Sequence, residues 1–458
     1  MATDPLYGLT PQALRACDSD AVWHPFTPMA EYGDPLIIVA GQGNYLFDAE
    51  GRRYLDGVSS LWCNVHGHRR PELDRAVREQ LEHIAHTTLL GLGSPPSIEL
   101  ARRLVALAPG DLNHVFFSDD GSTAVEAALK IALQYHQQKD PAEPGRRRFI
   151  ALQHAYHGDT IGCVSVGGIE LFHAKYAPLL FDVERVPAPY CYRCPLALAR
   201  DTCGLRCADE MDRLVEALGG AAAAFIIEPL VQGAAGMIVH PPGYLGRVRR
   251  ACDRAGCLLI ADEVAVGFGR TGAMFACEHE GVVPDLLCLA KALTGGYLPL
   301  AATLAREHVY RAFLGRRAAR RTFFHGHTYT GNALACAAAI ASLEVFEADR
   351  VLERLPQKIE RFGAALGELR GLKHVGDVRQ RGLMAGVELV ADRATRREYP
   401  YEAAVGDRVC SAVRQRGLIL RPLGDVIVLM PPLSITLAEI DFLVEATAEA
   451  IREVTESY

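Results

Sequence analysis

The chain has 458 residues, which is too long for one simple core and suits about two or three packed lobes. Half of its residues are hydrophobic and 22% are charged, as in ordinary globular proteins, and its net charge of -7 argues against nucleic acid or an anionic membrane as a partner. We see no basic and apolar leader and no apolar span long enough to cross a bilayer, so we expect a cytoplasmic protein without membrane contact.

The N-terminal part predicts an irregular arm followed by short strands. Two prolines in the stretch Trp23-His24-Pro25-Phe26-Thr27-Pro28-Met29 exclude a helix, and its aromatic side chains either line a site or pack as an arm. Short strands are predicted at 36–39, 45–47 and 53–55, which together form a small antiparallel unit.

A helical pattern follows from residue 71, and from residue 115 strands alternate with helices. The predicted strands are 115–117, 148–152, 224–227, 258–261, 286–289 and 301–304. This alternation is typical of an α/β fold with a parallel sheet and helical crossovers. Ligands bind such sheets at the carboxyl ends of the strands, so the residues that follow each strand are the candidates for a site.

Gly121-Ser122-Thr123 follows the first of these strands and begins a helix. Backbone N–H groups and the dipole at a helix N-terminus bind phosphate, and the Ser122 hydroxyl adds a donor. An ordinary capped helix is the alternative. Tyr156 follows the second strand, where it either stacks on a planar cofactor or lies in a surface turn.

The 13 cysteines are scattered mostly through apolar positions, where they act as small buried hydrophobes. One cluster differs, since Cys191-x2-Cys194 is followed by Cys203-x3-Cys207 in a predicted loop. That spacing is compatible with zinc but not specific for it. We expect no metal site, and the role of this loop stays open.

Two further strand ends carry reactive groups. Strand 258–261 ends in Asp262, and strand 286–289 leads to Lys291 in apolar surroundings, which lower the pKa of an amine and suit it to Schiff-base chemistry. A carboxylate near such a lysine fits a pyridoxal phosphate site, because it keeps the pyridine nitrogen protonated. Taken singly, Asp262 is better explained as a helix cap and Lys291 as an amine that reaches water.

The sheet pattern stops near residue 323, after a basic run at 316–321 that we interpret as a solvated helix face. An alanine-rich helix is predicted at 333–347, and strands at 383–389 and 426–430. The last helix begins with a capping box, Thr436-x-x-Glu439.

Together these motifs resemble those of class III aminotransferases, which are pyridoxal phosphate enzymes of fold type I. The matching stretches are Gly121-Ser122-Thr123, Tyr156-His157-Gly158-Asp159-Thr160, Glu228-Pro229, Asp262-Glu263-Val264, Gly267-Phe268-Gly269-Arg270-Thr271-Gly272, Lys291, and His325-Gly326-His327-Thr328 with Gly331-Asn332. The resemblance implies a mostly parallel central sheet with helices on both faces. It also implies a large cofactor-binding domain at 76–329 and a small α+β domain built from 1–75 and 330–458.

The resemblance also implies roles for single residues. Gly121 and Ser122 hold the cofactor phosphate, and Tyr156 lies against the ring and the substrate. Asp262 pairs with the pyridine nitrogen, and Lys291 binds the cofactor and moves protons in a ping-pong reaction.

The resemblance implies roles for three further residues. Gly326 contacts substrate, and His327 and Thr328 reach the cofactor phosphate of a neighbouring subunit. The chain is therefore expected to form a homodimer with shared active sites.

A narrower similarity is to the biotin-pathway branch of the family, which aminates 8-amino-7-oxononanoate to 7,8-diaminononanoate. It rests on the stretches 23–27, 56–62, 156–160, 421–424 and 430–432. By this similarity Arg421 grips the substrate carboxylate, which suits its planar guanidinium, and Trp62 lines the substrate pocket.

The resemblance implies that the amino donor is S-adenosylmethionine or L-lysine. Phe26 and Leu61 stand where the form of the enzyme that uses S-adenosylmethionine has a tyrosine and a tryptophan, and the form that uses lysine looks more like this chain. The alternatives are another class III transaminase for ω-amino acids or diamines, a pyridoxal phosphate mutase, and a binding protein without catalysis.

Overall fold

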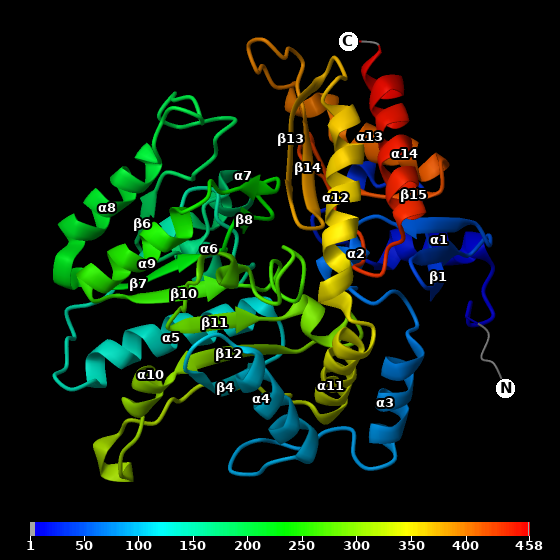
Figure 1. Cartoon of the computed structure of the whole chain (residues 1–458). Coiled ribbons are helices and arrows are strands. Elements are labelled where there is room, and N and C mark those ends of the chain that lie inside the picture. Colours follow the sequence, from blue (N-terminus) through cyan, green and yellow to red (C-terminus); the bar gives the residue numbers. More distant parts are fainter. Residues whose placement is uncertain (1–4, 457) are drawn as a thin grey trace.

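The computed structural model describes residues 5–456 and 458. Its largest sheet has seven strands in the order β4-β12-β11-β10-β7-β5-β6 (Figure 1). These strands are β4 (Leu112–Ser118), β5 (Arg148–Leu152), β6 (Val183–Val186), β7 (Ala222–Ile227), β10 (Leu258–Asp262), β11 (Leu286–Leu289) and β12 (Ala301–Arg306). The neighbours from β11 to β6 run parallel, and only β12 runs against the others, so the predicted α/β fold with a mostly parallel sheet is confirmed.

Helices cover both faces of this sheet, which explains why its central strands are apolar throughout. In β7, Phe225 and Ile227 pack in the same apolar cluster as α9 (Tyr244–Ala255), while Ala224 and Ile226 pack in the cluster of α5 (Gly121–Gln138). Figure 1 shows α9 and α5 on opposite sides of the sheet, with α8 (Arg206–Leu218) outside α9.

Two smaller sheets use the terminal parts of the chain. One joins β1 (Ile38–Gln42), β2 (Tyr45–Asp48) and β3 (Arg53–Asp56) to β15 (Leu418–Ile419), which runs parallel to β3. The other has the order β13-β14-β17-β16, with β13 (Val375–Arg381), β14 (Met384–Leu389), β16 (Arg421–Leu423) and β17 (Val426–Leu429). Helices α12 (Val351–Leu369) and α13 (Val405–Gln415) pack against this sheet, and α14 (Leu437–Thr455) packs against both helices.

Helix α11 (Ala333–Ala348) packs against α3 (Pro71–Leu81) and α4 (Pro95–Leu107). The remaining elements are α1 (Pro11–Ala21), α2 (Ser59–Trp62), α6 (Ile161–Val166), α7 (Glu170–His173), α10 (Glu307–Arg311), β8 (Val231–Gln232) and β9 (Ile238–Val239), with short 3-10 segments η1 (Met29–Glu31), η2 (Ala174–Leu179), η3 (Gly219–Ala221), η4 (Ala276–Glu280), η5 (Lys291–Thr294), η6 (Arg317–Ala319) and η7 (Tyr401–Ala403).

The caps of two helices confirm and refine the local predictions. Thr436 caps α14 and exchanges hydrogen bonds with Glu439, as the capping box predicts. Helix α5 is capped by Asp120, whose side chain accepts from the N–H of Thr123, so the phosphate motif lies inside the first turn. The basic run at 316–321 is largely exposed, but the helix face expected there is wrong, because only the 3-10 turn η6 forms and Arg320, directly after it, has φ +52°.

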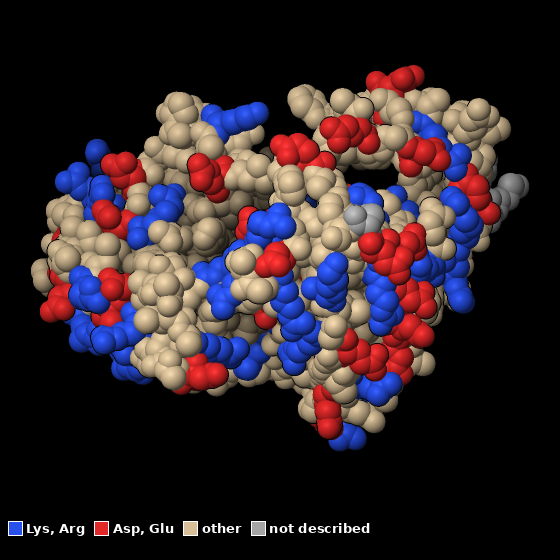
Figure 2. Space-filling model, turned by 90° about the horizontal axis from the view of Figure 1, so that it is seen from above, with Lys and Arg blue, Asp and Glu red and all other residues tan. Residues whose placement is uncertain are grey.

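Surface properties agree with the composition. Acidic and basic side chains are intermixed on the face shown in Figure 2, so that face carries no broad patch of a single sign. Within the described residues, none of the helices has both the length and the apolar character needed to cross a membrane.

Candidate functional site

A cavity of about 500 Å³ opens where the strands of the large sheet end. Its lining includes a residue after each of five strands: Ser122 after β4, Tyr156 after β5, Glu228 after β7, Asp262 at the end of β10, and Lys291 after β11. This is the edge at which ligands bind in α/β folds.

The start of α5 forms a close-fitting cradle on one side of the cavity. The N–H groups of Gly121 and Ser122 lie in the first helical turn, where no partner exists within the helix. A Cβ atom at Gly121 would lie 2.6 Å from Val264 Cγ1, and one at Gly158 would lie 2.1 Å from Ser122 Oγ. Glycine is therefore required at both positions, and the free N–H groups fit a phosphate.

Asp262 is buried and held in a fixed orientation. Its Oδ2 atom lies 2.7 Å from Nδ1 of the buried His157, and its Oδ1 atom accepts the N–H of Val264 at 3.1 Å. The other ring nitrogen of His157 is also buried and has no hydrogen-bond partner among the described residues. A carboxylate oriented in this way suits a protonated ring nitrogen of a cofactor.

Lys291 follows β11 in a left-handed backbone conformation, with φ +44°. Non-glycine residues rarely adopt this region, and such strain is concentrated at functional sites. Burial of the amine lowers the pKa of Lys291, so that more of it is neutral and nucleophilic. Its Nζ atom lies 5.0 Å from the centre of the Trp62 ring.

Glu228 also belongs to this site, although we did not predict it as a site residue. Its carboxyl accepts the N–H groups of Tyr156 at 3.2 Å and Gly233 at 2.9 Å. Burial, supported by the charge of Asp262, raises the pKa of Glu228 to about 7. The position of Glu228 directly after a predicted strand could have identified it as a site residue. His157 could have been identified in the same way, because it follows Tyr156 in a motif after another predicted strand.

The N-terminal and C-terminal parts of the chain line the other side of the cavity, which is mainly apolar and has a cation. Phe26, Leu61 and Trp62 offer apolar surface, and Arg421 at the start of β16 offers a guanidinium. The Cζ atom of Arg421 lies 5.7 Å from the centre of the Phe26 ring, but its guanidinium has no hydrogen bond or ion pair with any described residue. It is therefore available to an anionic group of a ligand.

The structure thus brings together nine of the predicted site residues: Phe26, Leu61, Trp62, Gly121, Ser122, Tyr156, Asp262, Lys291 and Arg421. The hydroxyl of Tyr156 donates to Asp159 at 2.7 Å. Gly326, His327 and Thr328 do not line this cavity. His327 Nδ1 does lie 3.2 Å from Oδ2 of Asp119, which lines it, and the expected role of these residues at a neighbouring subunit stays a prediction.

The four cysteines of the predicted loop have free thiols, although Cys207 lies in the first turn of α8 and not in a loop. Cys191, Cys194, Cys203 and Cys207 line a separate, much smaller cavity. Over the described part of the chain, no three side chains of His, Cys, Asp or Glu are grouped so as to hold a metal ion.

Comparisons with known proteins agree with this geometry. Residues 29–451 match the model of the aminotransferase class-III family. The adenosylmethionine-8-amino-7-oxononanoate aminotransferase of Nitratidesulfovibrio vulgaris is 61% identical over 445 residues, which are 97% of this chain and 82% of that protein.

Solved structures are similar over nearly the whole chain. The crystal structure of the enzyme with the same name from Methanocaldococcus jannaschii has a TM-score of 0.92 at 47% identity, covering 96% of this chain and 99% of that one. An (S)-enantioselective omega-transaminase from Thermomicrobium roseum has a TM-score of 0.92 at 38% identity, covering 97% and 99% of the two chains.

Proposed function

We propose a specific reaction for this chain, which belongs to the class III aminotransferase family. It transfers an amino group to 8-amino-7-oxononanoate and so makes 7,8-diaminononanoate for biotin synthesis. The observation that carries the proposal is the cavity that holds Lys291 and the unpaired guanidinium of Arg421 together. The acceptor has a ketone beside its amine at one end and a carboxylate at the other. Its conversion therefore needs Lys291 near the ketone and Arg421 near the carboxylate.

Pyridoxal 5′-phosphate, the cofactor of this family, supplies an electron sink that stabilises negative charge on the substrate carbon. The free N–H groups of Gly121 and Ser122 would hold its phosphate. Asp262, oriented by His157, would keep the ring nitrogen protonated. Tyr156, at the end of β5, would lie against the ring and the substrate.

Lys291 performs the proton transfers in this proposal. Its amine would hold the cofactor and, once a substrate amine has replaced it there, would take a proton from the substrate carbon that carries the amino group. Burial lowers the pKa of Lys291, which favours the neutral amine that this step needs. In the second half of the ping-pong cycle, Lys291 returns a proton to the former ketone carbon of the acceptor.

Substrate orientation falls to the terminal segments. Arg421 binds the acceptor carboxylate through its planar pair of N–H donors, and Phe26 and Trp62 contact the methylene chain between the two ends. The donor is S-adenosylmethionine or L-lysine. The names of the relatives include adenosylmethionine. Leu61 and Phe26, however, offer an adenosyl group less aromatic and polar surface than a tryptophan and a tyrosine would at these positions.

We propose further that the enzyme is a homodimer with shared sites. Gly326, His327 and Thr328 lie outside the lining of their own cavity, which supports a role at a neighbouring one. We place the protein in the cytoplasm, in keeping with its 13 free cysteines.

The test is a product assay. Holoenzyme is incubated with 8-amino-7-oxononanoate and either donor, and 7,8-diaminononanoate is measured by mass spectrometry. Product at a rate comparable with other aminotransferases supports the proposal. A failure with both donors, together with rapid turnover of ω-amino acids or diamines, would instead establish the second candidate, an ω-transaminase, which the similarity to the Thermomicrobium structure favours.

A further inference from the structure

A short turn forms part of the cavity wall. Residues 233–237 connect β8 to β9, and Ala234 lines the cavity. The N–H of Gly233 donates to the buried carboxyl of Glu228 at 2.9 Å. A Cβ atom at position 233 would lie 3.3 Å from the indole of Trp62. Any movement of this turn therefore changes both a wall of the cavity and a hydrogen bond to its buried acid.

The hairpin of β8 and β9 is too short to fix the turn by itself. It has two residue pairs, Val231 with Val239 and Gln232 with Ile238. The missing support comes from Arg379 on β13. Its Nε atom donates to the carbonyl oxygens of positions 236 and 237 at 2.9 Å each, and its Nη2 atom donates to the former at 2.5 Å.

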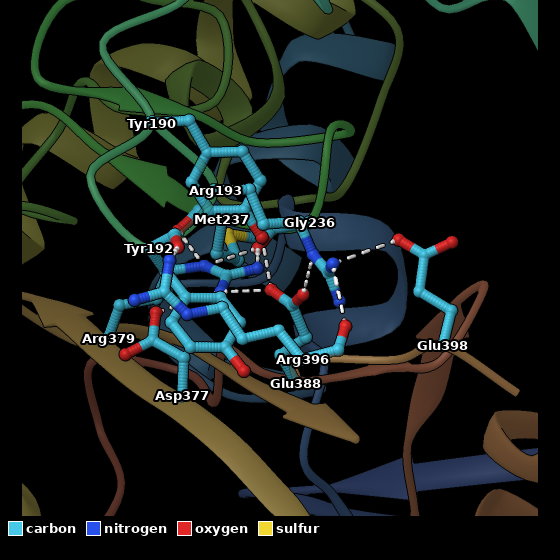
Figure 3. A network of polar contacts seen from close by, with 10 residues as sticks. All are labelled: Tyr190, Tyr192, Arg193, Gly236, Met237, Asp377, Arg379, Glu388, Arg396 and Glu398. Atoms are coloured by element: carbon cyan, nitrogen blue, oxygen red, sulfur yellow. Dashed lines mark hydrogen bonds and ion pairs between the residues drawn. The ribbon is translucent and has the colours of Figure 1, made fainter. Parts of the chain in front are cut away.

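Arg379 is itself held firmly, as Figure 3 shows. Its Nη1 atom donates to Glu388 at 2.6 Å and to Asp377 at 3.0 Å, and its Cζ atom lies 5.1 Å from the ring centre of Tyr190. Glu388 also accepts the hydroxyl of Tyr190, and Arg193 Nε at 2.6 Å. Arg379 and Glu388 are both buried, so their pairing is little screened by water.

The charges in this network keep it ionised. Burial favours the neutral form of Glu388, but the guanidinium of Arg379 and the donors beside it outweigh burial, so the pKa of Glu388 lies below its ordinary value. The guanidinium of Arg379 therefore has a permanent partner, and its remaining donors point to the two carbonyl groups of the turn.

We propose that Arg379 is a positioning residue of the active site, which holds the turn 233–237 against Trp62 and Glu228. The side chain touches neither substrate nor cofactor in this account. It acts through the turn, and its kinetic consequences rest on the proposed function. Loosening the turn should weaken substrate binding more than it slows the chemical step.

Tryptophan fluorescence can test this directly, because the chain has two tryptophans. Trp23 is 88% exposed and does not line the cavity, whereas Trp62 is 6% exposed. In a Trp23→Phe background, Trp62 is the sole emitter. Acrylamide quenching is measured with and without cofactor in Arg379→Met and in Arg193→Met. Both variants remove one arginine from the same network, but only Arg379 reaches the turn.

Removing the two carbonyl contacts of Arg379 should raise KM for 8-amino-7-oxononanoate about tenfold and lower kcat by no more than about threefold. Quenching of Trp62 should rise at least about twofold, because the wall beside the indole opens. Arg193→Met should leave both quantities within about twofold of the parent protein, even where it lowers Tm.

Equal effects of the two variants on quenching and KM would overturn the proposal and leave the network a purely structural element. If Arg379→Met yields no folded protein, Arg379→Lys decides instead, because a lysine can pair with Glu388 but cannot span both carbonyl groups. If the parent protein does not aminate the acceptor at all, the proposed function fails, while the quenching comparison still tests the positioning role.

Discussion

Replacement of Arg421 by methionine is expected to weaken binding of 8-amino-7-oxononanoate without disturbing the fold. The guanidinium is half-buried and makes no hydrogen bond or ion pair with any described residue. Its removal therefore leaves no buried carboxylate of the protein without a partner. The cation–π contact with Phe26 contributes about 0.5–1 kcal/mol at such a site. Its loss affects mainly the stability of the free enzyme, in which the guanidinium has no substrate carboxylate to bind.

The magnitude follows from the partial burial of the guanidinium. An exposed ion pair contributes less than about 1 kcal/mol, and removing one partner from a fully buried pair costs about 3–5 kcal/mol. A half-buried arginine lies between these limits, so the interaction with the acceptor carboxylate should contribute about 2 kcal/mol. This corresponds to a rise of about 30-fold in KM for the acceptor.

The assay compares the acceptor with an analogue that lacks its carboxylate. The parent enzyme should prefer the true acceptor by about 30-fold in kcat/KM, and Arg421→Met should bind both almost equally. Arg408→Met is a matched control, because Cζ of Arg408 lies 5.8 Å from the ring of Tyr458 and the residue does not line the cavity. A preference for the carboxylate that survives in Arg421→Met would refute the reasoning.

Three further outcomes are expected. Lys291→Ala should lower kcat by about 10³-fold or more while circular dichroism and Tm stay near those of the parent, because the amine moves the protons, and activity within a few-fold of the parent would contradict this role. Burial raises the pKa of Glu228 from 4.5 to about 7, so the folded protein takes up a proton between these values that the unfolded chain does not, and this contribution to stability is lost as pH rises through about 7. The Tm of the parent minus that of Glu228→Gln should therefore fall between pH 5 and pH 8, and a constant difference would show that Glu228 does not titrate there. When the holoenzyme is mixed with either donor, the absorbance of the Lys291-bound cofactor should fall faster with lysine than with S-adenosylmethionine. Leu61→Trp should raise the rate with S-adenosylmethionine, relative to the rate with lysine, by about tenfold, because the indole stacks on the adenosyl group. An unchanged ratio of the two rates would show that position 61 does not contact the donor.

The middle of the large sheet could be predicted because β7, β10 and β11 are continuous apolar runs buried on both faces. The predictions for β5 and β11 match the structure at both ends, and β10 extends by one residue to Asp262. Strand β12 is just as apolar although it runs antiparallel, so its direction could not be predicted from composition. Strand β6 was missed because it has four residues, of which only Val186 is buried.

The reactive residues were predictable for a related reason. Tyr156, Asp262 and Lys291 each follow a predicted strand, and the carboxyl ends of parallel strands meet at one edge. The same rule did not separate Asp262 from Glu263. In the structure Glu263 turns away from the cavity and accepts the N–H groups of Ala276 and Cys277, so only the first of the two adjacent carboxylates belongs to the site.

The roles of Trp62 and Arg421 on the substrate side of the cavity were predicted from resemblance alone, and the structure shows why. Trp62 comes from the N-terminal part and Arg421 from the C-terminal part, and β15 and β3 join these parts through two residue pairs. A contact between segments more than 350 residues apart leaves no periodic pattern in either one. The contacts of Arg379 could not be predicted for the same reason, because its partners lie on a strand, a turn and a loop of unrelated sequence.

The energetic costs of this site are concentrated where the chemistry requires them. Lys291 has a strained backbone and a destabilised ammonium form, and Glu228 is buried beside another carboxylate. Such features persist only when the surrounding structure holds them in place. The turn that donates to Glu228 is held by Arg379, whose own charge is balanced by Glu388 away from the cavity. Because Glu388 and Asp377 pair with Arg379 and do not line the cavity, their carboxylates do not compete with a substrate carboxylate for Arg421.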